Sequence, residues 1–322
     1  MAFKPIIVVA GEPNSVFLEI FFKSLNSKHF KSPIILIASE NVLKVQIKKF
    51  KFKFKYKIYN LDLKNIELNK IKKNQINLIN VKFQYSNFSK IISSKSNSYI
   101  NNCFKVALDL IKKEISNKLI NGPISKKYFL KKKYLGITEY LSEKTNSKNT
   151  AMLIYNKNLS VSPITTHLPI KLISKNIKKK VIISKIKLLC NFYKNHLKKT
   201  PNIAVTGLNP HCESILKFNE DTKIVNTSVK ILQKKGFKIS GPYSADTLFI
   251  KNNRKKYDVI VGMYHDQVLT PIKTIYEYDA INITLGLPFI RISPDHGPNE
   301  NMIGKNSSNP LSLIRALEFL DY

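Results

Sequence analysis

Three short apolar segments of this 322-residue chain each run directly into a histidine. The three histidines are His167, His211 and His265, out of six in the chain. Short apolar runs of this kind are typical of buried strands in a parallel sheet. Ligands of open α/β sheets bind at the carboxyl ends of the strands, so three imidazoles placed there would form a divalent-metal site with positions left for a substrate. Any one of them alone is more simply explained as a hydrogen-bonded structural residue, and it is the set of three that favours metal binding.

The rest of the chain alternates between strand-like and helix-like segments. Residues 5–10 and 33–38 are apolar runs typical of buried strands, and residues 16–25 between them carry apolar side chains at helical spacing. Residues 102–118 have the pattern of an amphipathic helix. Alternating strands and helices predict the α/β class with a parallel or mostly parallel sheet.

The charge of the chain is strongly positive, with 54 basic and 21 acidic side chains and a formal net charge of +33. Such a charge is typical of proteins that bind nucleic acid or an anionic surface. However, the arginines are Arg254, Arg291 and Arg315 alone, whereas protein–DNA interfaces use arginine heavily. Lysine, asparagine and isoleucine are abundant, which favours codon drift in an AT-rich genome as the source of the charge. We therefore expect no nucleic acid among the partners.

Residues 49–58 alternate strictly between lysine and apolar, mostly aromatic, side chains. Alternation of this kind predicts a strand with one buried and one solvated face. The alternative is a basic aromatic platform for nucleic acid, but the alternation puts the lysines and the rings on opposite faces. We therefore expect an ordinary edge strand.

The sequence shows no sign of a membrane segment or of an oxidising compartment. No apolar run approaches the ~18 residues of a membrane span, and the apolar stretch near the start of the chain is too short for a secretory signal. Cys103, Cys190 and Cys212 lack the paired spacing of a disulfide framework. We expect a cytoplasmic protein with no membrane partner.

Eight motifs occur in the order in which one enzyme family carries them. They are NGPISK at 121–126, TEYL at 138–141, TTHLP at 165–169, GLNPH at 207–211, ADT at 245–247, YHDQV at 264–268, NITLGLPFIR at 282–291 and DHG at 295–297. From residue 6 to about residue 317, the chain resembles the 4-hydroxythreonine-4-phosphate dehydrogenases of vitamin B6 biosynthesis. The histidine motifs and the long run ending at Arg291 make the resemblance specific.

The resemblance implies the fold of the isocitrate and isopropylmalate dehydrogenases, in which two α/β/α domains have a cleft between them. We expect residues 1–130 and about 270–322 to form the first domain. Residues from about 131 to 269 would form the second, contributing metal ligands and dimer contacts. The resemblance further implies a homodimer with its active site at the subunit interface.

The activity implied is NAD(P)-dependent oxidation of 4-phosphooxy-L-threonine at C3, followed by decarboxylation to 3-amino-2-oxopropyl phosphate. One divalent ion (zinc, magnesium, cobalt or manganese) would stabilise the alkoxide and then the enolate. The residues leave open which metal is used and whether NAD or NADP is preferred. Two alternatives also remain open: a divergent dehydrogenase of a related phosphorylated β-hydroxy acid, and a basic nucleic-acid-binding protein on an enzyme scaffold.

The resemblance places the functional residues of the family on particular positions of this chain. The metal ligands fall on His167, His211 and His265. The substrate-binding residues fall on Thr138, Lys273, Asn282 and Arg291, with Ile137 in place of a histidine. The candidates for catalytic roles are Lys273 and Asp246, the latter by orienting a ligand histidine or relaying a proton. Cofactor contacts are expected at Gly286, Asp295 and Gly297.

Two departures from the family pattern affect the expected site. Ile137 stands where the family has a substrate-binding histidine, and losing a hydrogen-bond donor to a charged group costs roughly 1.5–3 kcal/mol. The first loop, GEPNSVFLE at 11–19, lacks the two later glycines of the family loop, and the sequence after Gly297 also differs. Glycine permits backbone conformations that other residues avoid, so the cofactor contacts are the least specified part of the site.

Overall fold

The computed structural model describes residues 3–51, 57–62, 71–85, 91–130, 133–215, 218–294 and 297–322. The chain divides into two compact units. The first comprises Met1–Tyr140 and Pro288–Tyr322, and the second comprises Leu141–Leu287. The chain returns to the first unit at its end, and the two changes between the units lie at residues 140 and 287.

The sheet of the first unit is parallel throughout its described pairs. Its order is β3-β4-β2-β1-β5-β12, and every pair of neighbours runs parallel. Its strands are β1 (Ile6–Val9), β2 (Ile34–Ala38), β3 (Lys57–Asn60), β4 (Gln75–Asn80), β5 (Lys118–Asn121) and β12 (Ile290–Pro294). The central strands β1 and β2 are buried along their whole length, as expected of a parallel sheet with helices on both faces.

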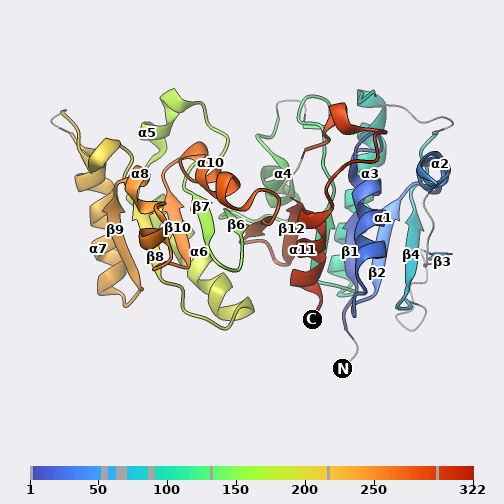
Figure 1. The fold of residues 1–322 in the computed structure, drawn as a ribbon, viewed down its shortest axis with the longest axis horizontal. Helices are drawn as coiled ribbons and strands as arrows, with labels where there is room; N and C mark the ends of the chain where they lie inside the picture. Colours follow the sequence, from blue (N-terminus) through green and yellow to red (C-terminus); the bar gives the residue numbers. More distant parts are fainter. Residues whose placement is uncertain are drawn as a thin grey trace. The chain divides into compact units, whose positions relative to one another are not determined.

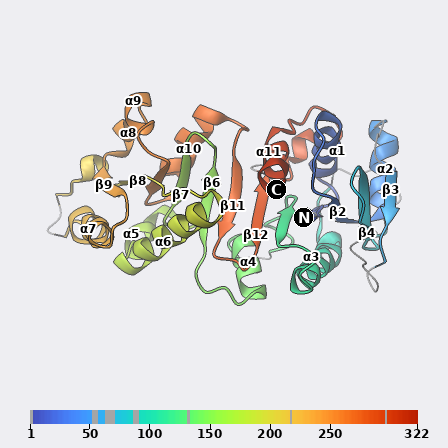
Figure 2. The ribbon, with the colours of Figure 1, turned by 90° about the horizontal axis from the view of Figure 1, so that it is seen from below.

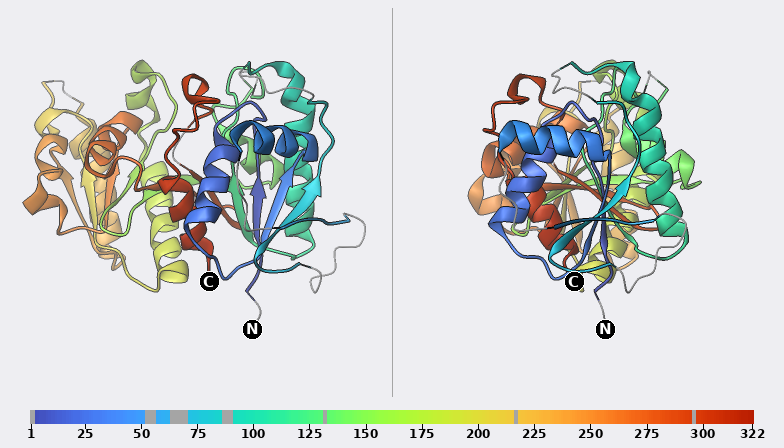
Figure 3. Two further views of the ribbon diagram at one scale, coloured as in Figure 1. Left: turned by 45° about the vertical axis from the view of Figure 1, so that its right-hand side comes forward. Right: turned by 90° about the vertical axis from the view of Figure 1, so that its right-hand side faces the viewer.

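Helices cover both faces of this sheet. They are α1 (Phe17–Ser27), α2 (Glu40–Phe50), α3 (Asn97–Lys112) and α11 (Leu311–Leu320), with short 3-10 turns η2 (Ser94–Ser96) and η6 (Glu300–Met302). In Figures 2 and 3, α1 lies on one side of the strands and α3 on the other. The predicted β-α-β start is confirmed. The helix expected over 102–118 begins earlier, at Asn97, and ends at Lys112. Lys118, the last residue of the predicted helix, belongs to β5 instead.

The strand predicted over residues 49–58 is wrong for its first part. Helix α2 begins after Ser39, whose hydroxyl accepts the amide of Val42, and it continues through Phe50. Lys51 then ends the helix in a left-handed conformation. Residues 52–56 lie outside the described part of the chain, and the edge strand β3 begins at Lys57. The start of the helix is stabilised by the cap at Ser39 and by the burial of Val42 and Leu43. The alternating pattern of residues 49–58 gives no indication of the cap or of this burial.

The second unit contains a mixed sheet with the order β11-β6-β7-β10-β8-β9. Its strands are β6 (Ala151–Tyr155), β7 (Ser160–Pro163), β8 (Ile203–Thr206), β9 (Ile239–Tyr243), β10 (Val259–Gly262) and β11 (Ile281–Leu285). The pairs of β6 with β7 and β11 are antiparallel, whereas β7, β10, β8 and β9 run parallel. The central strands β7, β8 and β10 are fully buried.

The helices of the second unit also lie on both faces of its sheet (Figures 1 and 2). They are α5 (Ile173–Asn176), α6 (Lys179–His196), α7 (Thr227–Lys234), α8 (Ala245–Leu248), α9 (Lys251–Arg254) and α10 (His265–Tyr276). Shorter turns are η3 (Ile170–Leu172), η4 (Pro210–Cys212) and the π-helix η5 (Asp221–Asn226). Helix α4 (Ile137–Lys144) spans the change from the first unit to the second.

The α/β class predicted from the sequence is confirmed in both units. None of the helices in the described part of the chain combines the length and the apolar character that crossing a membrane requires.

Candidate active site

The three candidate metal ligands follow buried strands, as the sequence predicts, and these strands are parallel neighbours in the sheet. Strand β10 lies between β7 and β8, with Gly262 opposite Pro163 and Val261 opposite Val205. His167, His211 and His265 come after the carboxyl ends of β7, β8 and β10. Because carboxyl ends of parallel strands meet at one edge of a sheet, the loops that carry the histidines leave from the same edge.

Two of these histidines lie side by side. The ring centroids of His167 and His265 are 5.8 Å apart, with an interplanar angle of 39°. A metal ion bonded to one nitrogen of each ring at about 2.1 Å fits between rings at this separation. Nδ1 of His265 lies 2.6 Å from Oδ1 of Asp266, and a proton held between these atoms would leave Nε2 free to bind a metal ion.

His211 lies in a different local setting. It sits in η4 with φ 55° and ψ 12°, and Cys212 follows with φ 61°. Asp246, at the start of α8, accepts hydrogen bonds from the Ser244 hydroxyl at 2.6 Å and the Thr247 amide at 2.8 Å. These bonds are the main cause of its lowered pKa, and His211 also contributes through its charge. Within the described ranges, no group of three or more His, Cys, Asp or Glu side chains is arranged to hold a metal ion.

Gln267 connects the two loops that carry His211 and His265. Its Oε1 accepts the Met263 amide at 2.7 Å and the Thr206 hydroxyl at 2.8 Å, and its Nε2 donates to the Gly207 carbonyl at 2.8 Å. One amide therefore joins the end of β8 to the end of β10. The YHDQV motif contains this residue, but its sequence position gives no indication of the partners.

The other candidates of the second unit lie on α10 and β11. Lys273 is exposed on α10, two turns beyond His265. Asn282 is half-buried on β11, and its Oδ1 is buried with no hydrogen-bond partner among the described residues. Gly286 has φ +88°, and a Cβ there would lie 2.1 Å from the carbonyl oxygen of Asn149. Packing of backbone against backbone therefore accounts for glycine at this position.

Arg291 is the central residue of the candidates in the first unit. It lies on β12 with 1% of its surface exposed, and its Nε donates to Oδ1 of Asn121 at 2.7 Å. Burial lowers the pKa of its guanidinium to about 9, and the charge of Glu139 acts in the opposite direction. Nδ2 of Asn121 donates to the Gly122 carbonyl at 2.8 Å, which fixes the amide with its oxygen toward Arg291. Asn121 lies in the NGPISK motif, yet sequence reasoning assigned it no role.

The remaining candidates are less closely defined. Ile137 and Thr138 are half-buried in the first turn of α4, beside Glu139. A Cβ on Gly297 would meet no atom within 4 Å, so the space beside this residue is open. Asp295 lies outside the described residues.

Glu12, in the first loop, is a buried carboxyl that sequence reasoning also missed. It is 2% exposed, and one of its oxygens accepts the Ser96 hydroxyl at 2.9 Å. Burial raises its pKa to about 7, against lowering contributions from Ser96 and the Asn14 backbone, and Glu300 adds a smaller upward contribution. The folded state therefore binds this proton more tightly than the unfolded state does.

The stability of the protein is expected to depend on pH through Glu12. Because the folded-state pKa is raised, its contribution is fully present below about 4.5 and is lost as the pH rises through about 7. The loss is on the order of 2–3 kcal/mol. Glu12→Gln keeps the shape of the protonated form and should remove this dependence. Urea unfolding of both proteins at pH 5 and pH 8 measures the difference, and an equal pH effect in both would show that Glu12 is not its source.

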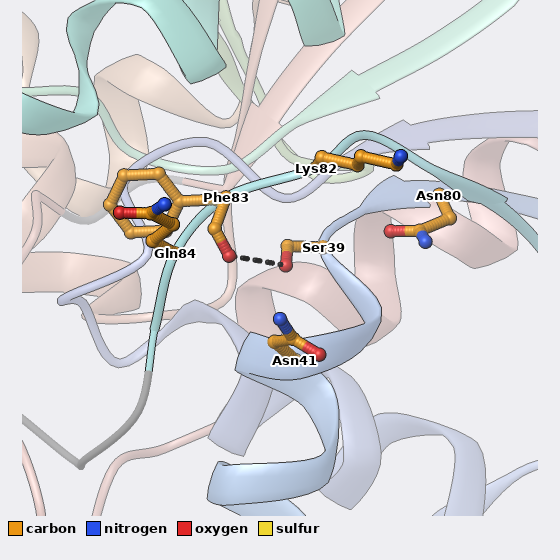
Figure 4. A pocket seen from close by; sticks show the side chains of 6 residues that line it. All are labelled: Ser39, Asn41, Asn80, Lys82, Phe83 and Gln84. Atoms are coloured by element: carbon orange, nitrogen blue, oxygen red, sulfur yellow. Dashed lines mark hydrogen bonds between the residues drawn. The ribbon is translucent and has the colours of Figure 1, made fainter.

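A surface hollow of about 440 Å³ lies at the start of α2, beside the segment after β4 (Figure 4). It is lined by Ser39, Asn41, Asn80, Lys82, Phe83 and Gln84. The Ser39 hydroxyl donates to the Phe83 carbonyl at 3.4 Å across it. None of the candidate site residues lines this hollow.

Comparison with known proteins decides the family. The family model described as "Pyridoxal phosphate biosynthetic protein PdxA" matches residues 29–320. The chain belongs to the PdxA family. A curated relative from Sulfurihydrogenibium sp., named 4-hydroxythreonine-4-phosphate dehydrogenase, is 37% identical over 319 residues, covering 97% of this chain and 95% of the relative. The family resemblance seen in the sequence is thereby confirmed.

Solved structures and a second curated relative extend the comparison. A crystal structure of the enzyme of that name from Klebsiella pneumoniae has a TM-score of 0.81 and 26% identity, covering 98% of each chain. An isocitrate dehydrogenase from Methylococcus capsulatus has a TM-score of 0.51 at 10% identity, covering 98% of this chain and 84% of that chain, which supports the predicted fold class. A relative from Pectobacterium atrosepticum named D-threonate 4-phosphate dehydrogenase is 32% identical over 231 residues, covering 71% of each chain.

Proposed function

We propose that this PdxA-family protein oxidises 4-phosphooxy-L-threonine at C3 with NAD(P) and releases 3-amino-2-oxopropyl phosphate and CO₂. The observation that carries the proposal is the His167–His265 pair, 5.8 Å apart at the carboxyl ends of adjacent parallel strands. A positive charge near the carbinol oxygen stabilises the alkoxide from which hydride leaves, and a metal held by neutral imidazoles retains its full charge.

The metal would be held by His167, His265 and His211. The 5.8 Å separation of the paired ring centroids supports a shared ion, and Asp266 orients the imidazole of His265. In the dimer that the family resemblance implies, histidines of both subunits would contribute ligands. A metal ion bound there would supply Lewis acidity toward the C3 hydroxyl, and a nicotinamide would supply the hydride acceptor.

The substrate groups would be held by the residues onto which the family resemblance places substrate contacts. Arg291 and Lys273 carry the positive charges suited to phosphate and carboxylate. Thr138 would donate through its hydroxyl. The buried Oδ1 of Asn282 supplies an acceptor for a substrate hydroxyl or amine. Lys273 and Asp246 are the titratable groups proposed to take up or return a proton.

The cofactor would lie near Gly297, where the open space beside the backbone allows a close approach. Asp295 belongs to the same proposed contact set. Gly286 fits this role less well, because its side-chain space is filled by the backbone at Asn149.

The competing proposal within the family is a dehydrogenase of a related phosphorylated β-hydroxy acid, which the name of the Pectobacterium relative illustrates. Both substrates carry the phosphate and a C3 hydroxyl to be oxidised. They differ at C2, where 4-phosphooxy-L-threonine bears an amine and D-threonate 4-phosphate a hydroxyl. We expect kcat/KM for 4-phosphooxy-L-threonine to exceed that for D-threonate 4-phosphate by about tenfold or more, because a polar site discriminates between a donor ammonium and a hydroxyl.

Initial rates of NADH formation with the two substrates measure this ratio. A preference for D-threonate 4-phosphate would replace the proposed substrate but keep the reaction type. Failure to form NADH from NAD or NADPH from NADP with either substrate, with each divalent metal tried, would overturn the proposed function.

A further inference from the structure

A buried carboxylate holds the loop that leads to His211. Asp221 is fully buried and begins the π-helix η5. Its Oδ1 accepts the amide of Leu208 at 2.5 Å, and its Oδ2 accepts the backbone and side-chain N–H groups of Asn209 at 3.1 and 2.9 Å. Hydrogen bonds to an ionised acceptor are shorter and roughly twice as strong as neutral ones, so these three bonds fix the loop at the end of β8.

The same loop is packed tightly and is locally strained. A Cβ on Gly207 would lie 3.0 Å from Oδ1 of Asp221 and 2.6 Å from Sγ of Cys212. Further along, His211 and Cys212 both have positive φ. Non-glycine residues in the left-handed region are strained, and such strain persists only where the surroundings impose it. The loop therefore needs an anchor, and Asp221 provides it.

The anchor determines where the imidazole of His211 lies. Leu208 and Asn209, the residues bound by Asp221, come two or three positions before His211. A shift of their backbone would move His211 with it. Gln267 holds the residue just before them through the Gly207 carbonyl, so relaxation at Asp221 leaves the loop attached only at its start.

We propose that Asp221 is a positioning residue that holds residues 207–212 in the strained conformation in which His211 can bind the metal ion. The inference rests on the proposed function, because that function gives His211 its metal. Asp221 itself takes no part in the chemistry.

The test uses Asp221→Asn in the full-length protein, with Co²⁺ as the metal probe because its visible absorption reports the ligands. Asparagine keeps the size of the side chain but replaces one acceptor oxygen with a donor. We expect backbone amides of residues 207–212 to exchange hydrogen about tenfold faster or more. We also expect the affinity for Co²⁺ to fall by about 10–100-fold, as for other residues that orient metal ligands.

The matched control is Asp258→Asn. Asp258 accepts the Asn202 amide at 2.8 Å and the Lys199 ammonium at 2.5 Å, just before β10 begins. It anchors the opposite ends of the same strands. This variant should lose stability while its Co²⁺ affinity stays within about twofold of the wild type. Where Asp221→Asn does not fold, Asn209→Ala removes one of the three bonds and should weaken Co²⁺ binding by about threefold.

The outcomes separate this inference from the proposed function. Faster exchange in the loop with unchanged Co²⁺ affinity and spectrum overturns the inference, as does unchanged exchange. Co²⁺ binding that depends on Asp221 without NADH formation overturns only the proposed substrate chemistry. A wild-type protein that does not bind Co²⁺ overturns both.

Discussion

Replacing His265 by alanine is expected to lower the rate of NADH formation by about a thousandfold or more. A metal ion contributes several kcal/mol of charge stabilisation in the transition state, and each 1.36 kcal/mol corresponds to a factor of about ten in rate. His265 forms the pair with His167, and its ring is oriented by Asp266. Loss of this imidazole would leave the proposed ion with too few protein ligands to stay bound at catalytic concentrations.

The matched control is His29→Ala. His29 is exposed between α1 and β2, and its removal should leave the rate within about twofold of the wild type. Both variants are assayed with the metal at saturation for the wild type, and circular dichroism verifies that each is folded. A His265→Ala protein that keeps a tenth of the wild-type rate contradicts the role assigned to the pair.

Replacing Gly286 by alanine is expected to lower the free energy of unfolding by about 3 kcal/mol or more. The new Cβ would lie 2.1 Å from the Asn149 carbonyl oxygen, and φ at this position is +88°. The atom in contact with the new Cβ belongs to the backbone, and it cannot move away by a rotamer change as a flexible side chain could. Strand β11, which ends at Leu285, would have to shift relative to the segment that enters β6.

Gly236→Ala separates the free-energy cost of the steric clash from the cost of placing alanine in a left-handed backbone conformation. Gly236 has φ +81°, and a Cβ there would meet nothing within 4 Å. Its replacement should cost only the left-handed conformation, about 1–2 kcal/mol. Urea unfolding of the two variants measures both effects. Equal losses of stability in the two variants would show that the contact with Asn149 does not destabilise Gly286→Ala. The interpretation of Gly286 as a cofactor contact, drawn from the sequence, would then be favoured.

The strand ends were predictable because the apolar runs and the histidines that follow them are local in the sequence. His167, His211 and His265 all follow buried strands, as predicted. That two of the rings form a pair was not predictable, since it depends on the course of each loop after its strand. The position of β10 between β7 and β8 likewise depends on long-range pairing that no local pattern specifies.

The residues that the sequence analysis missed act through distant partners. Asp221 lies in a segment without a recognised motif, and its acceptor oxygens meet amides 12 and 13 positions earlier. Asn121 meets Arg291 across 170 positions. Glu12 lies in a quoted loop, but its burial depends on α3 and its neighbours. A polar side chain reveals such a role only when the fold brings its partner to it.

The metal dependence of NADH formation tests the central claim most directly. The measurement is the initial increase in absorbance of NADH with 4-phosphooxy-L-threonine and NAD, before and after treatment with a chelator and after a divalent ion is added back. The account predicts that chelation abolishes the rate and that the added ion restores it in the wild type but not in His265→Ala. An undiminished rate in excess chelator would contradict it.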